Sequence, residues 1–155
     1  MVNIIKGDLL AATEDVICHQ VNCQGVMGSG VAKAIREKWP EVYKAYHAHV
    51  LIHTSDILGS DILGTNLLVP IENHHRAIIN MFAQDLYGYD GNRYTSYDAF
   101  YSCLEDIKEN VSSHCSIAFP YKIGSDRGGA SWDVIYAMIC DVLGDRDVTI
   151  YKLED

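Results

Sequence analysis

His19 stands immediately before a glycine-rich stretch, and together they could place proton transfer beside a bound phosphate. Histidine is suited to moving protons near neutrality, because its unperturbed pKa is roughly 6.5. Residues 22–32 read NCQGVMGSGVA, between a run typical of a strand and a run typical of a helix. Backbone N–H groups at the start of a helix bind anions, and glycine lets an anion approach closely. The stretch therefore predicts a phosphate-bearing ligand.

A second loop of the same kind covers residues 123–132 and reads IGSDRGGASW. It also lies between a strand-like run and a helix-like run. Ligands of open α/β sheets bind at the carboxyl ends of the strands, where both loops are expected. We interpret the two loops as N–H cradles that face one diphosphate. The alternative for either loop is an ordinary glycine turn.

The elements that position these loops alternate along the chain. Short runs rich in branched residues predict strands, and apolar side chains at steps of three and four predict helices. The alternation predicts one α/β domain over residues 1–155, with a three-layer α/β/α architecture and a mixed, largely parallel central sheet. The expected strands are 2–5, 16–21, 66–71, 76–83, 115–120 and 147–153, and the expected helices are 29–38, 40–51, 95–111 and 131–143.

Composition narrows the class of protein. Hydrophobic residues make up 48% of the chain and charged residues 21%, which is ordinary for a soluble globular domain. The net charge of −9 argues against general nucleic-acid binding, so a bound anion must be held locally. The opening MVNIIKGDLL is too short and too charged for a signal peptide, and no apolar run is long enough to span a bilayer. We expect a cytoplasmic monomer with no membrane contact.

The spacing of the cysteines and histidines does not predict a metal site. The five cysteines form no CxxC pair, and we expect reduced thiols, with Cys18, Cys103 and Cys140 as small core side chains. His47, His49 and His53 lie in HAHVLIH, where no HExxH motif or neighbouring cysteine or carboxylate ligand accompanies them. A solvated surface cluster is the better interpretation. We expect neither a metal nor a cofactor.

Three further patterns in the sequence bear on the ligand and on the fold. The glycines of the first loop run GxxGxG, which is the wrong order for the dinucleotide fingerprint GxGxxG. Gly25 to Gly30 has P-loop spacing, but Val31 and Ala32 stand where Lys and Ser or Thr are needed. The direct duplication SDILGSDILG, residues 55–64, is interpreted as a surface-loop insertion, because five residues cannot form a packing unit.

Three segments together carry a family resemblance: NIIKGDLL, VICHQVNCQGVMGSGVAKAIREKWPEVYKAY and FPYKIGSDRGGASW. They resemble a macrodomain over nearly the whole chain. The resemblance is to the branch that contains terminal ADP-ribose protein glycohydrolase, the macrodomains of DNA ADP-ribosylation antitoxins and the yeast-type ADP-ribose-1''-phosphate phosphatase. It implies that the ligand is ADP-ribose or a derivative of it.

The resemblance also implies a binding role for particular residues. Asp8, next to Leu9, would be a buried carboxylate that accepts a hydrogen bond from the adenine amine, and its alternative is a helix N-cap. Asn22 would approach the distal ribose. Tyr151 and Leu153 would flank the adenine, with edge packing as the alternative. The loop residues expected to wrap the distal ribose and diphosphate are Gly28, Ser29, Gly30 and Val31, and those expected in the second wall are Ile123, Gly124, Ser125, Arg127, Gly128 and Gly129.

The implied catalytic residues depart from the glycohydrolases of this branch, which use a lysine and an acidic residue. The corresponding stretch NMFAQDLYGYDG holds Gln84 and Asp85 but no lysine, and the acidic position of the second loop falls on Gly128. The pattern is more similar to the phosphatases, with His19 and Asp126 as candidate proton-transfer groups. The favoured reaction is removal of the 1''-phosphate from ADP-ribose-1''-phosphate. Release of ADP-ribose from protein or nucleic acid, a non-catalytic ADP-ribose reader, and a core role for His19 are the alternatives.

Overall fold

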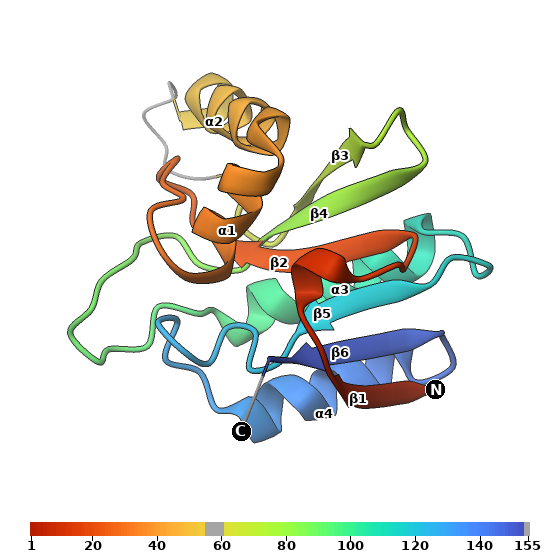
Figure 1. Ribbon diagram of the computed structural model, residues 1–155. Coiled ribbons are helices and arrows are strands. Elements are labelled where there is room, and N and C mark those ends of the chain that lie inside the picture. The colour runs from red at the N-terminus through yellow and green to blue at the C-terminus, as the bar shows by residue number, and fades with distance from the viewer. Residues whose placement is uncertain (55–60, 154–155) are drawn as a thin grey trace.

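The computed structural model describes residues 1–54 and 61–153, and it shows one six-stranded sheet between two layers of helices (Figure 1). The strands lie in the order β1-β6-β5-β2-β4-β3. All neighbouring pairs are parallel except β3 and β4. The strands are β1 (Val2–Lys6), β2 (Val16–Val21), β3 (Asn66–Ile71), β4 (Arg76–Phe82), β5 (Ile117–Pro120) and β6 (Val148–Lys152), and the helices are η1 (Leu9–Ala11), α1 (Gly30–Lys38), α2 (Pro40–Thr54), α3 (Tyr97–Asn110) and α4 (Trp132–Leu143).

The sheet separates two hydrophobic cores. Helices α1 and α2 cover one face, and α3 and α4 cover the other (Figure 1). Alternate residues of β2 serve both sides, since Ile17 and Val21 pack toward α1 and α2 while Val16 and Cys18 pack toward α3 and α4. The three-layer α/β/α fold and the mixed, largely parallel sheet are therefore confirmed.

The predicted elements are all present, and their ends differ from the prediction by a few residues. Strand β2 has the predicted bounds, whereas β5 begins at Ile117 rather than at Cys115. Helix α2 begins at Pro40 as predicted, because proline fits the first turn of a helix. Cys18 and Cys103 are buried as expected, but Cys140 is only partly covered.

The duplicated segment lies mostly outside the described residues, because its residues 55–60 are not described. Its second copy is more than a surface loop, since Ile62 is buried and packs in the core on the α2 side of the sheet. The backbone N–H of Gly64 also donates to the carbonyl of Phe82 at 2.7 Å. Among the helices of residues 1–54 and 61–153, none is long and apolar enough to cross a membrane.

Strand order brings the two glycine loops together. β2 and β5 are neighbouring parallel strands, so the loops that follow Val21 and Pro120 leave the same edge of the sheet. The chain continues from one loop into α1 and from the other into α4, on opposite faces (Figure 1). A crevice opens at such a point in doubly wound sheets, which is where ligands bind.

Candidate functional site

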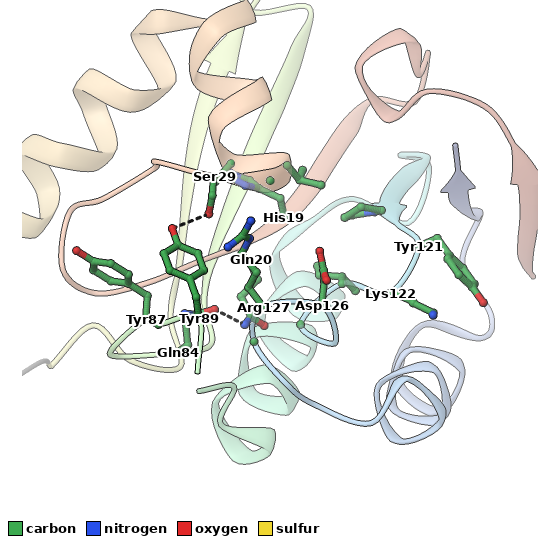
Figure 2. Close-up of a pocket in the computed structure, with 18 residues that line it drawn as sticks. His19, Gln20, Ser29, Gln84, Tyr87, Tyr89, Tyr121, Lys122, Asp126 and Arg127 are labelled. Carbon is green, nitrogen blue, oxygen red and sulfur yellow. Dashed lines mark hydrogen bonds between the residues drawn. The ribbon is translucent and has the colours of Figure 1, made fainter. Parts of the chain in front are cut away.

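A solvent-open cavity lies at this edge of the sheet, between the two glycine loops (Figure 2). The end of β2 forms its floor, the start of α1 one wall, and the loop after β5 the opposite wall. A third wall comes from residues 84–89, which follow β4. The lining residues are His19, Gln20, Ser29, Gly30, Val31, Ala32, Gln84, Tyr87, Gly88, Tyr89, Pro120, Tyr121, Lys122, Ile123, Gly124, Asp126, Arg127 and Gly128.

The first residues of α1 line this cavity, and the backbone N–H groups of a helix's first turn have no partner within the helix. Ser29 is the N-cap, but its side chain makes no capping hydrogen bond. Its hydroxyl instead accepts from the Tyr89 hydroxyl at 3.3 Å. Gly30 has a φ of +60°, and a Cβ built on it would meet no atom of the described residues within 4 Å. The first turn of α1 therefore opens onto free space, as an anion site at a helix N-terminus requires.

In the second loop, glycine is required for a different physical reason, which is close packing against neighbouring residues. A Cβ on Gly128 would lie 2.3 Å from Oγ1 of Thr95, and a Cβ on Gly124 would lie 2.9 Å from Oε1 of Gln20. The Gly128 carbonyl accepts from the backbone N–H of Thr95 at 3.0 Å. Glycine is needed here because the loop packs tightly against its neighbours, and this packing fixes the second wall of the cavity.

The charged side chains that line the cavity are two cations and one carboxylate, in a chain with a net charge of −9. Lys122 has a φ of +61°, an uncommon conformation for a residue with a side chain. The Arg127 guanidinium lies 4.2 Å from the ring centroid of Tyr89, in a cation–π contact that ties the second loop to the third wall. Asp126 is exposed on the same loop (Figure 2). The local charge is thus opposite in sign to that of the whole chain.

His19 lies beneath the cavity floor and is only 1% exposed. Its Nε2 is 2.6 Å from Oδ1 of Asn80, and its Nδ1 is buried without a hydrogen-bond partner among the described residues. Burial lowers the pKa of His19 to about 4, and the hydrogen bond with Asn80 opposes this only in part. His19 is therefore neutral near pH 7, with one N–H group and one unprotonated ring nitrogen that can accept a proton.

The structure brings only part of the predicted set to the cavity. Both candidate proton-transfer residues line it, together with seven of the predicted ligand-binding residues. The members at the cavity are His19, Asp126, Ser29, Gly30, Val31, Ile123, Gly124, Arg127 and Gly128. The members away from it are Asp8, Leu9, Asn22, Gly28, Ser125, Gly129, Tyr151 and Leu153.

Asn22 is occupied by the loop that it begins. Its Nδ2 donates to the carbonyl of Val26 at 2.8 Å, and its Oδ1 accepts from the N–H of Gln24 at 3.0 Å. The Tyr46 hydroxyl also donates to this oxygen at 2.8 Å. The side chain therefore holds the shape of the first loop.

The predicted adenine residues gather at a neighbouring place, where β1 and β6 end. Asp8 is the N-cap of η1 and accepts from the N–H of Leu10 at 2.9 Å. The expectation of a buried carboxylate is wrong, because Asp8 is exposed. The Tyr151 ring lies against Gly7, where a Cβ would be 3.1 Å from its Cδ1, and its hydroxyl donates to Glu14 at 2.6 Å. Leu9 is buried and Leu153 is exposed.

The third wall was missed by sequence reasoning. Gln84 was noted only as the position without a lysine, and Tyr87 and Tyr89 were not singled out. Their placement after β4 was the available signal, since the carboxyl ends of neighbouring parallel strands meet at one edge. The lysine at the cavity, Lys122, comes from the second loop instead.

The histidine cluster lies on α2, away from the cavity. His47 is exposed, and the rings of His49 and His53 lie 4.4 Å apart. His53 also faces Asp61, with 3.5 Å between Nδ1 and Oδ1. No group of three metal-ligating side chains occurs within the described ranges.

Comparison with known proteins places these features in context. The profile of the Macro domain family matches residues 18–139. An ADP-ribose 1''-phosphate phosphatase of Scheffersomyces stipitis is 38% identical over 76 residues, which cover 45% of this chain and 43% of that protein. A DNA ADP-ribosyl glycohydrolase of Mycobacterium tuberculosis is 41% identical over 46 residues, which cover 30% of this chain and 13% of that protein. Each match spans less than half of the relative's length.

A solved structure extends the likeness to the whole fold. The macrodomain of Mycobacterium tuberculosis DarG has a TM-score of 0.81 to this chain, with 23% sequence identity over 99% of both chains. At that level of identity the likeness concerns the fold alone.

Proposed function

This chain belongs to the Macro domain family, and from that premise we propose that it binds ADP-ribose and hydrolyses a derivative of it. The observation that carries the proposal is the open start of α1. Its N–H groups and Gly30 face the cavity without a capping side chain, and Lys122 and Arg127 face the same space. These groups can bind a diphosphate on an otherwise acidic protein.

The proposed ligand extends beyond the cavity. The cavity holds about 190 Å³, which is less than the roughly 300–1,000 Å³ of pockets that enclose a drug-sized ligand. We place the diphosphate between the loops after β2 and β5, and the adenine toward the ends of β1 and β6. There the exposed Asp8 carboxylate would accept from the adenine amine, with Tyr151 beside it. The distal ribose then lies toward β4 and residues 84–89.

The favoured reaction is removal of the 1''-phosphate from ADP-ribose-1''-phosphate. The similarity to the phosphatase of Scheffersomyces stipitis supports it, as does the presence of His19 and Asp126 at one cavity. In this reaction His19 accepts a proton from the attacking water, because it is neutral at physiological pH. Asp126 is the exposed carboxylate on the opposite wall and the second candidate proton-transfer group.

Release of ADP-ribose from DNA or protein is the second candidate. The similarity to the DNA ADP-ribosyl glycohydrolase of Mycobacterium tuberculosis favours it. Residues 80–91 contain no lysine, but Lys122 reaches the cavity from the other side. A route through a lysine can therefore be tested at one residue, Lys122.

We further propose that the protein acts as a cytoplasmic monomer.

Calorimetry with ADP-ribose tests the binding proposal. ADP-ribose should bind with a stoichiometry of one, and inorganic phosphate should bind far more weakly, because it contacts only the loops. ADP, which lacks the distal ribose, should lie between them. Absence of heat with ADP-ribose under conditions where the protein is folded would contradict the proposal.

A further inference from the structure

A row of three hydrogen-bonding groups crosses the sheet beneath the cavity. His19 on β2 is paired in register with Asn80 on β4, and Asn80 is paired with Leu67 on β3. Nε2 of His19 lies 2.6 Å from Oδ1 of Asn80, and Nδ2 of Asn80 donates to the Leu67 carbonyl at 3.0 Å. Asn80 is 0% exposed and His19 1%, so bulk water does not compete for these bonds.

The Leu67 carbonyl at the end of this row decides which group donates and which accepts in each hydrogen bond. A backbone carbonyl can only accept, so the amide nitrogen of Asn80 must face Leu67 and its oxygen must face His19. That oxygen also only accepts, so Nε2 of His19 must carry a hydrogen. A neutral imidazole has one N–H, which leaves a lone pair on Nδ1. The backbone of β3 thus fixes the tautomer of a side chain two strands away.

The second ring nitrogen of His19, Nδ1, takes no part in this row of hydrogen bonds. Nδ1 of His19 is buried and has no partner among the described residues, although the ring lines the cavity. A parallel chain of bonds begins at the carbonyl of Leu86, which accepts from Nε2 of Gln84 at 2.8 Å. Oε1 of Gln84 accepts from Nε2 of Gln20 at 2.7 Å, and Oε1 of Gln20 is buried with no partner in the part of the chain that the structure describes. Each of these two series of hydrogen bonds ends in an acceptor atom that has no donor in residues 1–54 and 61–153, Nδ1 of His19 and Oε1 of Gln20. A buried acceptor is stabilised by a donor such as water or a hydroxyl.

We propose that Asn80 is a positioning residue that holds His19 as the Nε2–H tautomer, so that Nδ1 takes a proton from the water that attacks the substrate. This inference rests on the proposed function. The water oxygen bonds to phosphorus as its proton passes to Nδ1. The bond between phosphorus and the 1''-oxygen breaks, and that oxygen takes a proton from solvent as ADP-ribose leaves. Phosphate departs, and Nδ1 returns its proton to solvent.

Because the Asn80 side chain carries no charge, it favours the protonated form of His19 less than a carboxylate would. Burial alone holds the pKa of His19 low, and no charged group contributes to the shift. The charged side chains facing the cavity are Lys122, Asp126 and Arg127, all on the opposite wall. A carboxylate at position 80 would stabilise the imidazolium and occupy Nδ1 with a proton. An amide keeps the lone pair available.

Nuclear magnetic resonance tests the tautomer directly and needs no turnover. Long-range proton–nitrogen correlations of His19 should show Nε2 protonated and Nδ1 unprotonated at pH 7. In Asn80→Asp, the His19 titration should move upward by more than one pH unit. A protonated Nδ1 in the wild type, or an unmoved titration in Asn80→Asp, would overturn the inference even if ADP-ribose binds.

Kinetics on ADP-ribose-1''-phosphate gives the second arm. Asn80→Leu should lower kcat by about 10- to 100-fold with KM little changed, the scale seen for groups that orient a metal-ligating histidine. In Asn80→Asp, the acid limb of the rate profile should move toward neutral pH. Asn66→Ala is the matched control, because Asn66 also donates to a backbone carbonyl, that of Cys103 at 2.9 Å, without contacting His19. Equal losses in Asn66→Ala and Asn80→Leu would overturn the positioning role.

Discussion

Gly30→Glu places a carboxylate in the space where the diphosphate is proposed to bind. Within residues 1–54 and 61–153, a Cβ at this position meets no atom within 4 Å, so there is open space where the new side chain begins. At about 4–6 Å from a phosphate, the repulsion between unit charges is about 3–4 kcal/mol for an effective dielectric constant near 20. We expect the affinity for ADP-ribose to fall by roughly 150- to 1,000-fold. Calorimetry on the folded variant measures this loss.

Gly91→Glu is the matched control for backbone strain. Gly91 also has a positive φ, +81°, and an open Cβ position, but it does not line the cavity. Both substitutions should cost about 1–2 kcal/mol of stability, because an L side chain is disfavoured in this conformation. Their melting temperatures should therefore fall by similar amounts, about 2–8 °C. If Gly91→Glu weakened ADP-ribose binding as much as Gly30→Glu, or if Gly30→Glu still bound normally, the assignment of the anion site would be refuted.

Three further predictions concern single residues. Asp8→Ala should weaken ADP-ribose binding by about 10- to 150-fold, the range for a hydrogen bond to a charged group, and equal affinities in calorimetry would remove Asp8 from the adenine site. His19→Ala should slow turnover of ADP-ribose-1''-phosphate by about 10²–10⁴-fold with little change in ADP-ribose affinity, and a wild-type rate would exclude His19 from the chemistry. His19 should also make stability depend on pH: the unfolded chain gains a proton near pH 6.5 and the folded chain only near pH 4, so the free energy of unfolding should fall by about 3 kcal/mol between those values as pH falls. Denaturation at several pH values should show this slope in the wild type and lose it in His19→Gln.

The fold was predictable because its signals are local. Strand β2 is a short apolar run between polar segments, and Pro40 marks the start of α2, so both were placed at the correct residue. The start of β5 was placed two residues early. There the backbone N–H of Ser116 is bonded to the Asp15 side chain at 2.8 Å, a partner 101 residues distant. Ladder pairing decides where a strand begins, and it depends on tertiary contacts.

The site was predictable in part, for the same reason. The glycines at the start of α1 are visible in the sequence and indicate a backbone that a ligand can approach closely. The cavity wall formed by the start of α1 was therefore predicted. Asn22 begins the first loop, but its hydrogen bonds go to the nearby backbone, which spacing alone does not reveal. Asp8 follows β1, and the structure shows it as a helix N-cap, the alternative interpretation of this residue. The partnership of His19 with Asn80 spans 61 residues, and only the strand register brings the two together.

The most direct test of the central claim is turnover of three substrates side by side: ADP-ribose-1''-phosphate, ADP-ribosylated protein and ADP-ribosylated DNA. The account predicts release of inorganic phosphate from the first, at a rate that His19→Ala lowers. Faster release of ADP-ribose from DNA or protein than of phosphate would favour the second candidate reaction. No turnover of any of the three by protein that binds ADP-ribose would contradict the claim that the protein is a hydrolase and leave it a reader of ADP-ribose.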